Sequence, residues 1–386
     1  MMEGWVKGRL SDLFEIKPSK SEAKDSLSNK DFVSFLPMED LGVATKSVTA
    51  VKEKQLKDVI GSYTYFADGD VLLAKITPCF ENGKLGIAEG LKNGVGFGSS
   101  EYIVFRPKSN VIAEYLFYFL SQPRFREEGA QNMSGAVGHK RVSKEFIENF
   151  ELPYPQSINE QKHIVATLDE AFAAIDKAKA NVERNLQNAR ELYSVSLNRD
   201  FNGSQQLGEL VNLCTGKLNA NAANEGGEFP FFTCSREVSR IDTYAFDCEA
   251  ILLAGNNAVG DFNVKHYKGK FNAYQRTYVI TIKPKVELDY RFLFYQMERS
   301  LANLKEKSVG AGTKFLKLPV IQSLEILFPT LKEQKDFVRS LYAIEKHTKD
   351  LIRVYKTKLD KMESLKSTLL NEAFSGQLTT PKLELA

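Results

Sequence analysis

The stretch EQKHIVATLDEAFAAIDKAKANVERNLQNARELYSVSLNRDFNG, residues 160–203, has no Pro and no Gly before its final residue. Its apolar residues alternate at spacings of three and four, the heptad pattern of a coiled-coil helix. They are Val165, Leu168, Phe172, Ile175, Val182, Leu186, Ala189 and Tyr193. An ordinary core helix is the alternative, but forty helical residues would span about 60 Å, roughly twice the diameter of a small domain. The pattern therefore predicts a long helix that packs against another one.

That partner is a second copy of the same segment. Glu160-Gln161-Lys162 recurs as Glu333-Gln334-Lys335, an offset of 173 residues, and 12 of the 44 positions from Glu160 to Gly203 are identical at that offset. The second seam is Val338, Leu341, Ile352, Tyr355, Leu359, Met362 and Leu369, with Lys179, Glu345 and Lys366 as polar departures. Six repeated apolar positions are the expected coiled-coil and partner-binding residues: Val165, Leu168, Leu186, Val338, Leu341 and Leu359.

A looser repeat precedes each helix, so each half reads as a variable β-rich domain followed by a well-matched helix. The expected boundaries are 1–157, 158–203, 204–331 and 332–386. Each helix should start just after a Pro and stop at Phe-x-Gly, and short helices are expected at 114–120 and 290–304. The predicted fold class is α+β: two β-rich α/β domains joined by two long antiparallel coiled-coil helices, with a pseudo-twofold internal repeat.

Composition limits the class of protein. The 52 Lys and Arg against 49 Asp and Glu leave a net charge of only +3. Any surface that binds nucleic acid must therefore be a local cluster of positive charge. No run of about 18 apolar residues exists and the first residues lack the apolar core of a signal peptide, which predicts a cytoplasmic protein without a membrane role. The four Cys residues and four His residues lack metal-site or redox spacing, which favours reduced, structural cysteine.

The search for catalytic motifs finds none that is specific. Gly-Lys pairs at 83, 216 and 269 lack the other residues of a phosphate-binding loop. There is no Pro-Pro dipeptide, which excludes the loop that amino-methyltransferases use to hold the exocyclic amine. Glu15-Ile16-Lys17 with Asp12 only faintly resembles a nuclease magnesium site. The sequence therefore predicts a chain that is not an enzyme.

Polar residues beside flexible glycines point to nucleic acid instead. Ser134-Gly135-Ala136-Val137-Gly138-His139-Lys140-Arg141 and Val309-Gly310-Ala311-Gly312-Thr313-Lys314 occupy the same place in the two halves. Glycine lets backbone approach a surface, and Lys, Arg and Thr donate to phosphates or base edges. A solvated basic turn is the alternative, which the recurrence disfavours. Sixteen residues are predicted to contact nucleic acid: Lys75, Thr77, Asn82, Lys84, Ser99, Ser100, His139, Lys140, Arg141, Lys265, Lys268, Lys270, Gln275, Arg276, Thr313 and Lys314.

The order of these parts resembles the specificity subunit of type I restriction-modification systems. The resemblance rests on a Pro a few residues before each Glu-Gln-Lys helix, on Lys75-Ile76-Thr77-Pro78-Cys79-Phe80-Glu81-Asn82-Gly83-Lys84, and on Asn-Glu-Ala-Phe-Ser-Gly-Gln-Leu at 371–378. It covers essentially the whole chain. The resemblance implies a non-catalytic subunit with two target recognition domains, each of which reads one half of a bipartite, asymmetric site on double-stranded DNA.

The resemblance also implies partners. The two helices would set the spacer between the half-sites and dock two methyltransferase (modification) subunits. No cofactor is expected on this chain: S-adenosylmethionine belongs to the modification subunits, and ATP and Mg²⁺ to the restriction subunits of the full complex. Two alternatives stay open, namely a coiled-coil scaffold with two β-rich interaction domains and no nucleic-acid role, and a subunit that directs methylation only.

Overall fold

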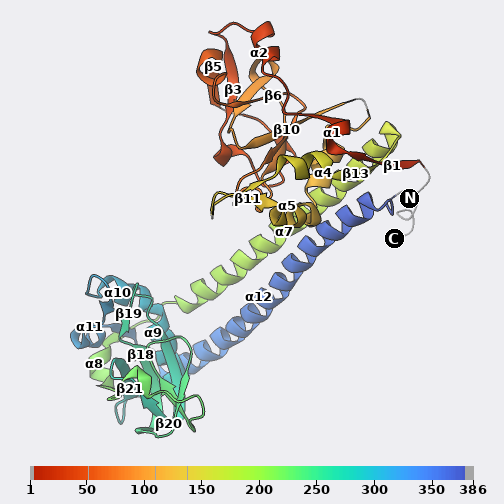
Figure 1. Cartoon of the computed structure of the whole chain (residues 1–386). Helices are drawn as coiled ribbons and strands as arrows, with labels where there is room; N and C mark the ends of the chain where they lie inside the picture. Colours follow the sequence, from red (N-terminus) through yellow and green to blue (C-terminus); the bar gives the residue numbers. More distant parts are fainter. Residues whose placement is uncertain (1–3, 51, 109, 137, 379–386) are drawn as a thin grey trace. The chain divides into compact units, whose positions relative to one another are not determined.

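The computed structural model describes residues 4–50, 52–108, 110–136 and 138–378 (Figure 1). Val137 of the first glycine-rich segment and residues 379–386 of the predicted last region lie outside this part. The chain divides into two compact units, Met1–Asn181 with Thr357–Ala386, and Val182–Lys356. Each long helix contributes one part to each unit.

The two long helices are present as predicted. They are α7 (Ile158–Leu197) and α12 (Leu331–Phe374). The predicted seam is their least exposed face: Val165, Leu168 and Leu341 are buried, and Leu186, Val338 and Leu359 are half-buried. Within the described residues no helix is long and apolar enough to span a bilayer.

The helices run antiparallel inside each unit. In the first unit Lys366 Nζ donates to Asp176 Oδ1 over 2.5 Å, and Lys179 forms an ion pair with Glu363. Residue numbers therefore rise along one helix as they fall along the other, and the two lysines among the polar seam departures pair across the interface. In the second unit the same direction brings the Thr348 hydroxyl 3.5 Å from the carbonyl oxygen of Ala189.

One predicted helix end is wrong. α12 ends at Phe374, and Gly376 has the expected positive φ of 79°, but α7 ends at Leu197, well before Phe201. Arg299 explains the early end, because its guanidinium donates to the carbonyl oxygen of Arg199 (3.1 Å) and to the carboxylate of Asp200 (3.0 Å). A tertiary contact thus replaces the last helical turn that the sequence pattern predicted.

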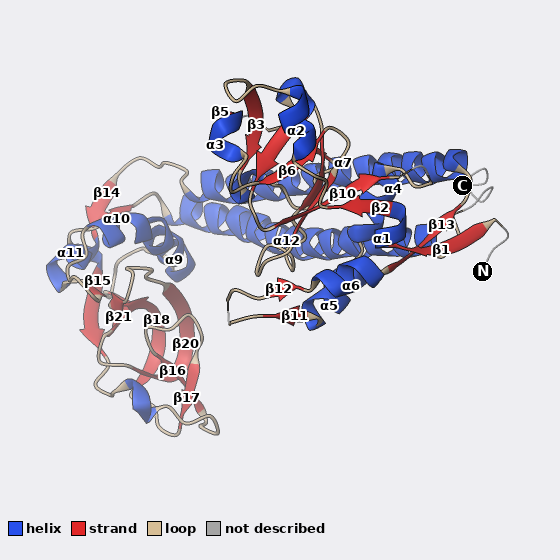
Figure 2. Cartoon of the chain, turned by 45° about the horizontal axis from the view of Figure 1, so that its top comes forward, coloured by secondary structure: helices blue, strands red, loops and turns tan. Residues whose placement is uncertain are grey.

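A five-stranded sheet of order β2-β10-β7-β8-β4 is the centre of the first unit. β1 pairs separately with β13 (Figure 2). The strands are β1 (Trp5–Arg9), β2 (Phe14–Ile16), β4 (Ser47–Val48), β7 (Val71–Ala74), β8 (Leu85–Ala88), β10 (Tyr102–Pro107) and β13 (Glu151–Pro155). The helices are α1 (Leu10–Leu13), α4 (Ala113–Leu120), α5 (Pro123–Gln131) and α6 (Lys144–Asn149). Leu370 and Phe374 of α12 complete the core between them.

The first unit carries an additional four-stranded sheet of order β5-β3-β9-β6. Its elements are α2 (Ser21–Ser26), β3 (Phe32–Leu36), η1 (Met38–Asp40), β5 (Lys52–Gln55), α3 (Leu56–Val59), β6 (Thr64–Ala67), η2 (Lys92–Gly94) and β9 (Val95–Gly98). The chain enters it between β2 and β7 and again between β8 and β10. Val33, Leu56 and Phe97 form its own small core.

The second unit repeats the central sheet and not the additional one. Its six-stranded order is β15-β21-β18-β20-β16-β17, whose first four strands match β2-β10-β7-β8, and β14 pairs with β23 as β1 does with β13. The strands are β14 (Ser204–Gln206), β15 (Val211–Thr215), β16 (Phe229–Phe232), β17 (Ser239–Ile241), β18 (Phe246–Ala254), β20 (Val264–Ala273), β21 (Thr277–Ile282) and β23 (Glu325–Leu327). The helical elements are α8 (Leu207–Leu210), η3 (Ala220–Ala222), α9 (Tyr290–Arg299), α10 (Leu301–Glu306) and α11 (Leu318–Gln322).

A buried glutamine explains the repeated Glu-Gln-Lys. The side chain of Gln161 is fully buried; its Nε2 donates to the carbonyl oxygen of Pro155 (2.9 Å), and its Oε1 accepts from the backbone N–H of Ile112 (3.1 Å). Gln334 does the same in the second unit with Pro329 (2.9 Å) and Asp289 (2.9 Å). One amide thus ties the start of the long helix to the preceding strand and to the start of α4 or α9, and satisfies backbone groups that would otherwise be buried unpaired.

Candidate nucleic-acid interface

The first glycine-rich segment is the tip of a β-hairpin between β11 (Met133–Ser134) and β12 (Arg141–Val142). Gly135 has a φ of 125°, and a Cβ at this position would lie 2.9 Å from the carbonyl oxygen of His139. Only glycine fits that conformation without strain. The predicted residues His139 and Lys140 are exposed on this tip.

The base of the hairpin is attached to the segment that follows β7. Ile76 forms an antiparallel bridge with Arg141, and the backbone N–H of Thr77 donates to the carbonyl oxygen of Lys140 over 2.9 Å. The structure therefore brings together two groups of predicted residues that are some 60 positions apart in the sequence.

Two predicted DNA donors near this base have partners inside the protein. Lys75 Nζ donates to the carbonyl oxygen of Ser100 (3.0 Å) and lies 4.0 Å from the carboxylate of Glu101. The Thr77 hydroxyl donates to Glu81 Oε1 over 2.8 Å. Both side chains are half-buried, so they hold the loop as well as lining its surface.

The remaining residues of this first group lie along the same loops. Lys84 Nζ donates to the carbonyl oxygen of Met38 over 2.6 Å, and the hydroxyl of Ser99 accepts from the backbone N–H of Glu101 over 3.2 Å. Asn82 and Ser100 are exposed. The ammonium of Lys84 is thus directed at the additional sheet's η1, whereas Asn82 is open to solvent.

Glu101 is a functional candidate that sequence reasoning missed. Arg141 Nε and Nη2 donate to its two carboxylate oxygens over 2.9 and 2.7 Å. These hydrogen bonds hold the pKa of the Glu101 carboxyl below its ordinary value. An acidic residue between Ser99-Ser100 and a strand, inside a set of predicted cations, is the signal that could have identified it.

The second glycine-rich segment forms the equivalent hairpin. Its β22 (Lys314–Phe315) pairs antiparallel with β19 (Asn256–Asn257), which follows β18 as Ile76 follows β7. Gly310 has a φ of 115°, and a Cβ there would lie 2.0 Å from the carbonyl oxygen of Thr313. Thr313 and Lys314 are half-buried at this tip, in contrast to the exposed tip of the first unit.

Three of the lysines predicted to contact DNA lie on β20. Side chains alternate along a strand, so Lys265 lies on one face, and Lys268 and Lys270 lie on the other. Lys265 Nζ donates to the carbonyl oxygen of Ser235 over 2.6 Å, and burial lowers the pKa of its ammonium. Lys268 pairs with Glu249 over 3.0 Å. The three lysines therefore belong to two different surfaces of the second unit.

Gln275 and Arg276 lie in the loop before β21 and are both exposed. Gln275 Nε2 donates to Asn219 Oδ1 over 2.7 Å, so two amides are linked on this surface. The guanidinium carbon of Arg276 lies 4.9 Å from the ring centroid of Phe315. Arg276 therefore joins this loop to the second hairpin, and Asn219 is a further candidate that the sequence did not single out.

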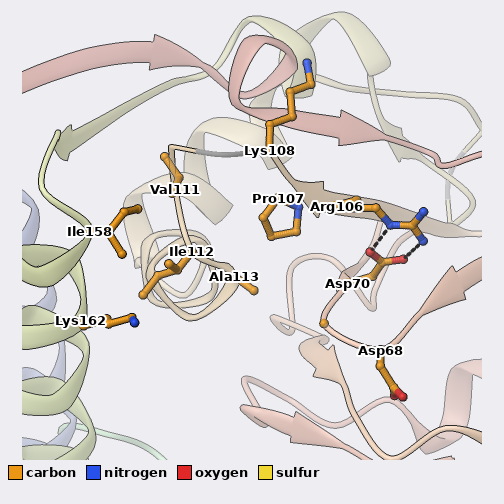
Figure 3. A pocket seen from close by; sticks show the side chains of 11 residues that line it. Asp68, Asp70, Arg106, Pro107, Lys108, Val111, Ile112, Ala113, Ile158 and Lys162 are labelled. Atoms are coloured by element: carbon orange, nitrogen blue, oxygen red, sulfur yellow. Dashed lines mark hydrogen bonds and ion pairs between the residues drawn. The ribbon is translucent and has the colours of Figure 1, made fainter. Parts of the chain in front are cut away.

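The first unit also contains a cavity of about 480 Å³ beside β10 (Figure 3). Asp70 lies at its edge, and Arg106 donates to both of its carboxylate oxygens, Nε over 2.8 Å and Nη2 over 2.7 Å. Burial raises the pKa of the Asp70 carboxyl, and the contact with Arg106 offsets part of that rise. Figure 3 shows Lys162 of α7 at the opposite side of the cavity. The carboxylate is committed to an arginine, which fits a structural ion pair that connects β10 to the loop before β7.

Within the described ranges, no group of three His, Cys, Asp or Glu residues is placed to hold a metal ion. Asp12 and Glu15, the two acidic residues of the faint nuclease resemblance, are accordingly not part of such a group.

Comparisons with known proteins agree with this architecture. Residues 2–184 and 200–367 match the family described as "Type I restriction modification DNA specificity domain". The chain belongs to this family of type I restriction-modification specificity subunits, which confirms the resemblance seen in the sequence.

Several relatives are similar over different lengths. The specificity subunit of the type I restriction enzyme EcoAI of Escherichia coli is 34% identical over 54% of this chain and 35% of its own length, and that of EcoEI is 38% identical over 45% and 29%. The match thus spans about a third of those relatives. The putative MjaX specificity subunit of Methanocaldococcus jannaschii is 22% identical over 97% of this chain and 94% of its own.

Solved structures share the fold. A chain from a study of complex assembly and conformational transition of the type I R-M system superposes with a TM-score of 0.77, at 17% identity, over 98% of this chain and 99% of that one. The HsdS subunit from Thermoanaerobacter tengcongensis gives a TM-score of 0.63 at 17% identity over 97% and 98%.

Proposed function

We propose that this chain is the DNA sequence-specificity subunit of a type I restriction-modification complex, and that each unit reads one half of a bipartite, asymmetric target. The observation that carries the proposal is the pair of equivalent hairpins. Both have a glycine of positive φ at the tip and an anchor on the segment after the central strand, β7 or β18, yet their tip residues differ. Equivalent readers with different tips suit two different half-sites.

In this proposal the tips and the nearby amides read bases. Amide side chains such as Gln275 and Asn82 can pair with adenine, and Lys140 or Lys314 can contact guanine or phosphate. Phosphate contacts only position each unit, so base discrimination rests on few side chains. The buried positions of α7 and α12 keep the helices paired, and their outer faces dock two methyltransferase subunits.

The chain itself supplies no reacting group in this proposal. The modification subunits carry S-adenosylmethionine, and the restriction subunits, where present, carry ATP and Mg²⁺. Double-stranded DNA and these subunits are the proposed partners, in the cytoplasm.

Selection from a randomised duplex pool tests the proposal. The full chain, together with its methyltransferase partner, should enrich duplexes that contain two short motifs at a fixed spacing. The methyltransferase alone is the control and should enrich none. Enrichment of no motif by the complex would favour the scaffold with two interaction domains instead, and a single motif without a spacer would contradict two readers.

A further inference from the structure

Backbone hydrogen bonds identify equivalent positions at the bases of the two hairpins. In the first unit the backbone N–H of Lys75 donates to the carbonyl oxygen of Glu101, and the N–H of Val142 donates to that of Lys75, both over 2.9 Å. In the second unit Gly255 takes the place of Lys75: its N–H donates to Arg276 and its carbonyl oxygen accepts from the N–H of Leu316, again both over 2.9 Å. Glu101 is therefore equivalent to Arg276.

The same pattern equates Arg141 with Phe315. Each directly precedes the residue that donates to the segment after the central strand, and each forms the antiparallel bridge to that segment, Arg141 with Ile76 and Phe315 with Asn256. The two pairs Glu101–Arg141 and Arg276–Phe315 thus occupy the same two positions.

In both units an arginine connects these two positions. It occupies the hairpin position in the first unit and the loop position in the second. In the first unit Arg141 belongs to the hairpin and donates twice to Glu101 of the loop before β10. In the second unit Arg276 belongs to the loop before β21 and lies over the ring of Phe315 in the hairpin. A bidentate ion pair in the first unit corresponds to a cation–π contact in the second.

We propose that Glu101–Arg141 and Arg276–Phe315 are equivalent latches, and that their residues position the hairpin tips for base discrimination without reading bases themselves. The inference deepens the proposed function and rests on it. Lys140 directly precedes the latch residue Arg141, and Lys314 directly precedes Phe315. Fixing the hairpin base therefore fixes the donors of the tip, and a tip that is ordered before binding loses less entropy on binding.

The alternative role for these residues is stability or direct phosphate contact. The Arg141 side chain is 47% exposed, and an ion pair at that exposure adds little to the stability of a fold. Its guanidinium is already committed to Glu101, which leaves less capacity for a phosphate. Arg276 makes no ion pair with any described residue, so the second latch keeps its positive charge.

Charge exchange in the first latch tests the inference. The full chain with its methyltransferase partner is measured on the selected duplex and on duplexes with single base changes. Glu101→Arg and Arg141→Glu should each lower discrimination in the half-site of the first unit by up to about fivefold, the largest factor expected from one partly exposed ion pair, while discrimination in the other half-site stays unchanged. The double exchange should restore most of the loss.

Two further variants separate positioning from phosphate contact. Arg141→Gln should leave the slope of log affinity against log salt unchanged, because a lost phosphate contact would reduce it by about 0.9. In the second unit Phe315→Leu should lower discrimination in its own half-site, and Phe315→Tyr, which keeps the ring, should not. Thermal melting of all variants should match the unsubstituted chain.

The results that overturn the latches differ from those that overturn the proposed function. A shallower salt slope for Arg141→Gln with equal loss on all duplexes would show that Arg141 binds DNA directly. A double exchange as impaired as the single ones would show that the pairing of Glu101 with Arg141 does not position the tip. Unsubstituted complex without any sequence preference would instead end the proposed function.

Discussion

If the paired helices set the spacing of the two half-sites, removing one heptad from each should shorten the preferred spacer. Suitable segments are residues 182–188 of α7 and 349–355 of α12, which adjoin the contact between Ala189 and Thr348. Because the seam repeats every seven residues, the helices keep their apolar face after the deletion. Seven residues shorten a helix by about 10 Å, which corresponds to roughly three base pairs of duplex.

The same arithmetic predicts a loss of affinity. One heptad makes two full turns of a coiled-coil helix, so its removal does not rotate one unit relative to the other about the helix axis. Three base pairs, in contrast, turn the duplex by about 100° at some 10 base pairs per turn. The shortened chain should therefore select a spacer about three base pairs shorter and bind it more weakly than the original chain binds its own target, since the duplex must twist to present both half-sites.

Selection from a pool with randomised spacers measures the shift. A control chain keeps the length of both helices but exchanges the surface residues of the same heptads for other helix-forming residues, and it should keep the original spacer. An unchanged spacer with undiminished affinity in the shortened chain would show that the helices do not set the spacing of the half-sites.

Three other predictions follow from the side chains. Lys314→Ala should weaken binding to all duplexes and reduce the salt slope by about 0.9, whereas Gln275→Ala should relax preference at one base; both are read from binding titrations, and equal loss on every duplex from both would contradict the division. Leu168→Ala, in a fully buried side chain, should cost about 2–5 kcal/mol in chemical denaturation, whereas Leu192→Ala, 57% exposed, should change stability by less than about 0.5 kcal/mol. Burial raises the pKa of the Glu298 carboxyl, so its ionisation opposes folding as pH rises; Glu298→Gln should stabilise the fold at pH 8 more than at pH 4, and a reversed order would contradict this sign.

The sequence predicted the helices well because their signal is local. Leu168 and Leu341 belong to a periodic apolar pattern, and periodic burial decides which face of a helix packs. The end of α7 could not be predicted in the same way, since Arg299, a hundred residues away, decides it. Helix termini that tertiary contacts determine leave no signal in the local pattern.

The sequence predicted the two glycine-rich tips, but not the hydrogen-bond partners of the candidate side chains around them. The glycines of both hairpins were visible, because a positive φ favours that residue. Residue types alone could not show that Lys75 would donate to Ser100, or that Lys265 and Lys268 would lie on opposite faces of one strand. Residue type identifies side chains that are able to bind DNA. Sheet register decides which of these side chains instead form hydrogen bonds within the protein.

The two repeats share the contacts that hold the start of each long helix and differ in the domains that precede these helices. Gln161 and Gln334 keep the same three hydrogen bonds, although the first unit contains an additional four-stranded sheet that the second unit lacks. A buried amide that leaves backbone groups unpaired when lost permits little change, whereas exposed loops permit much. The latches fall between these extremes, because the two positions are kept while their chemistry is exchanged.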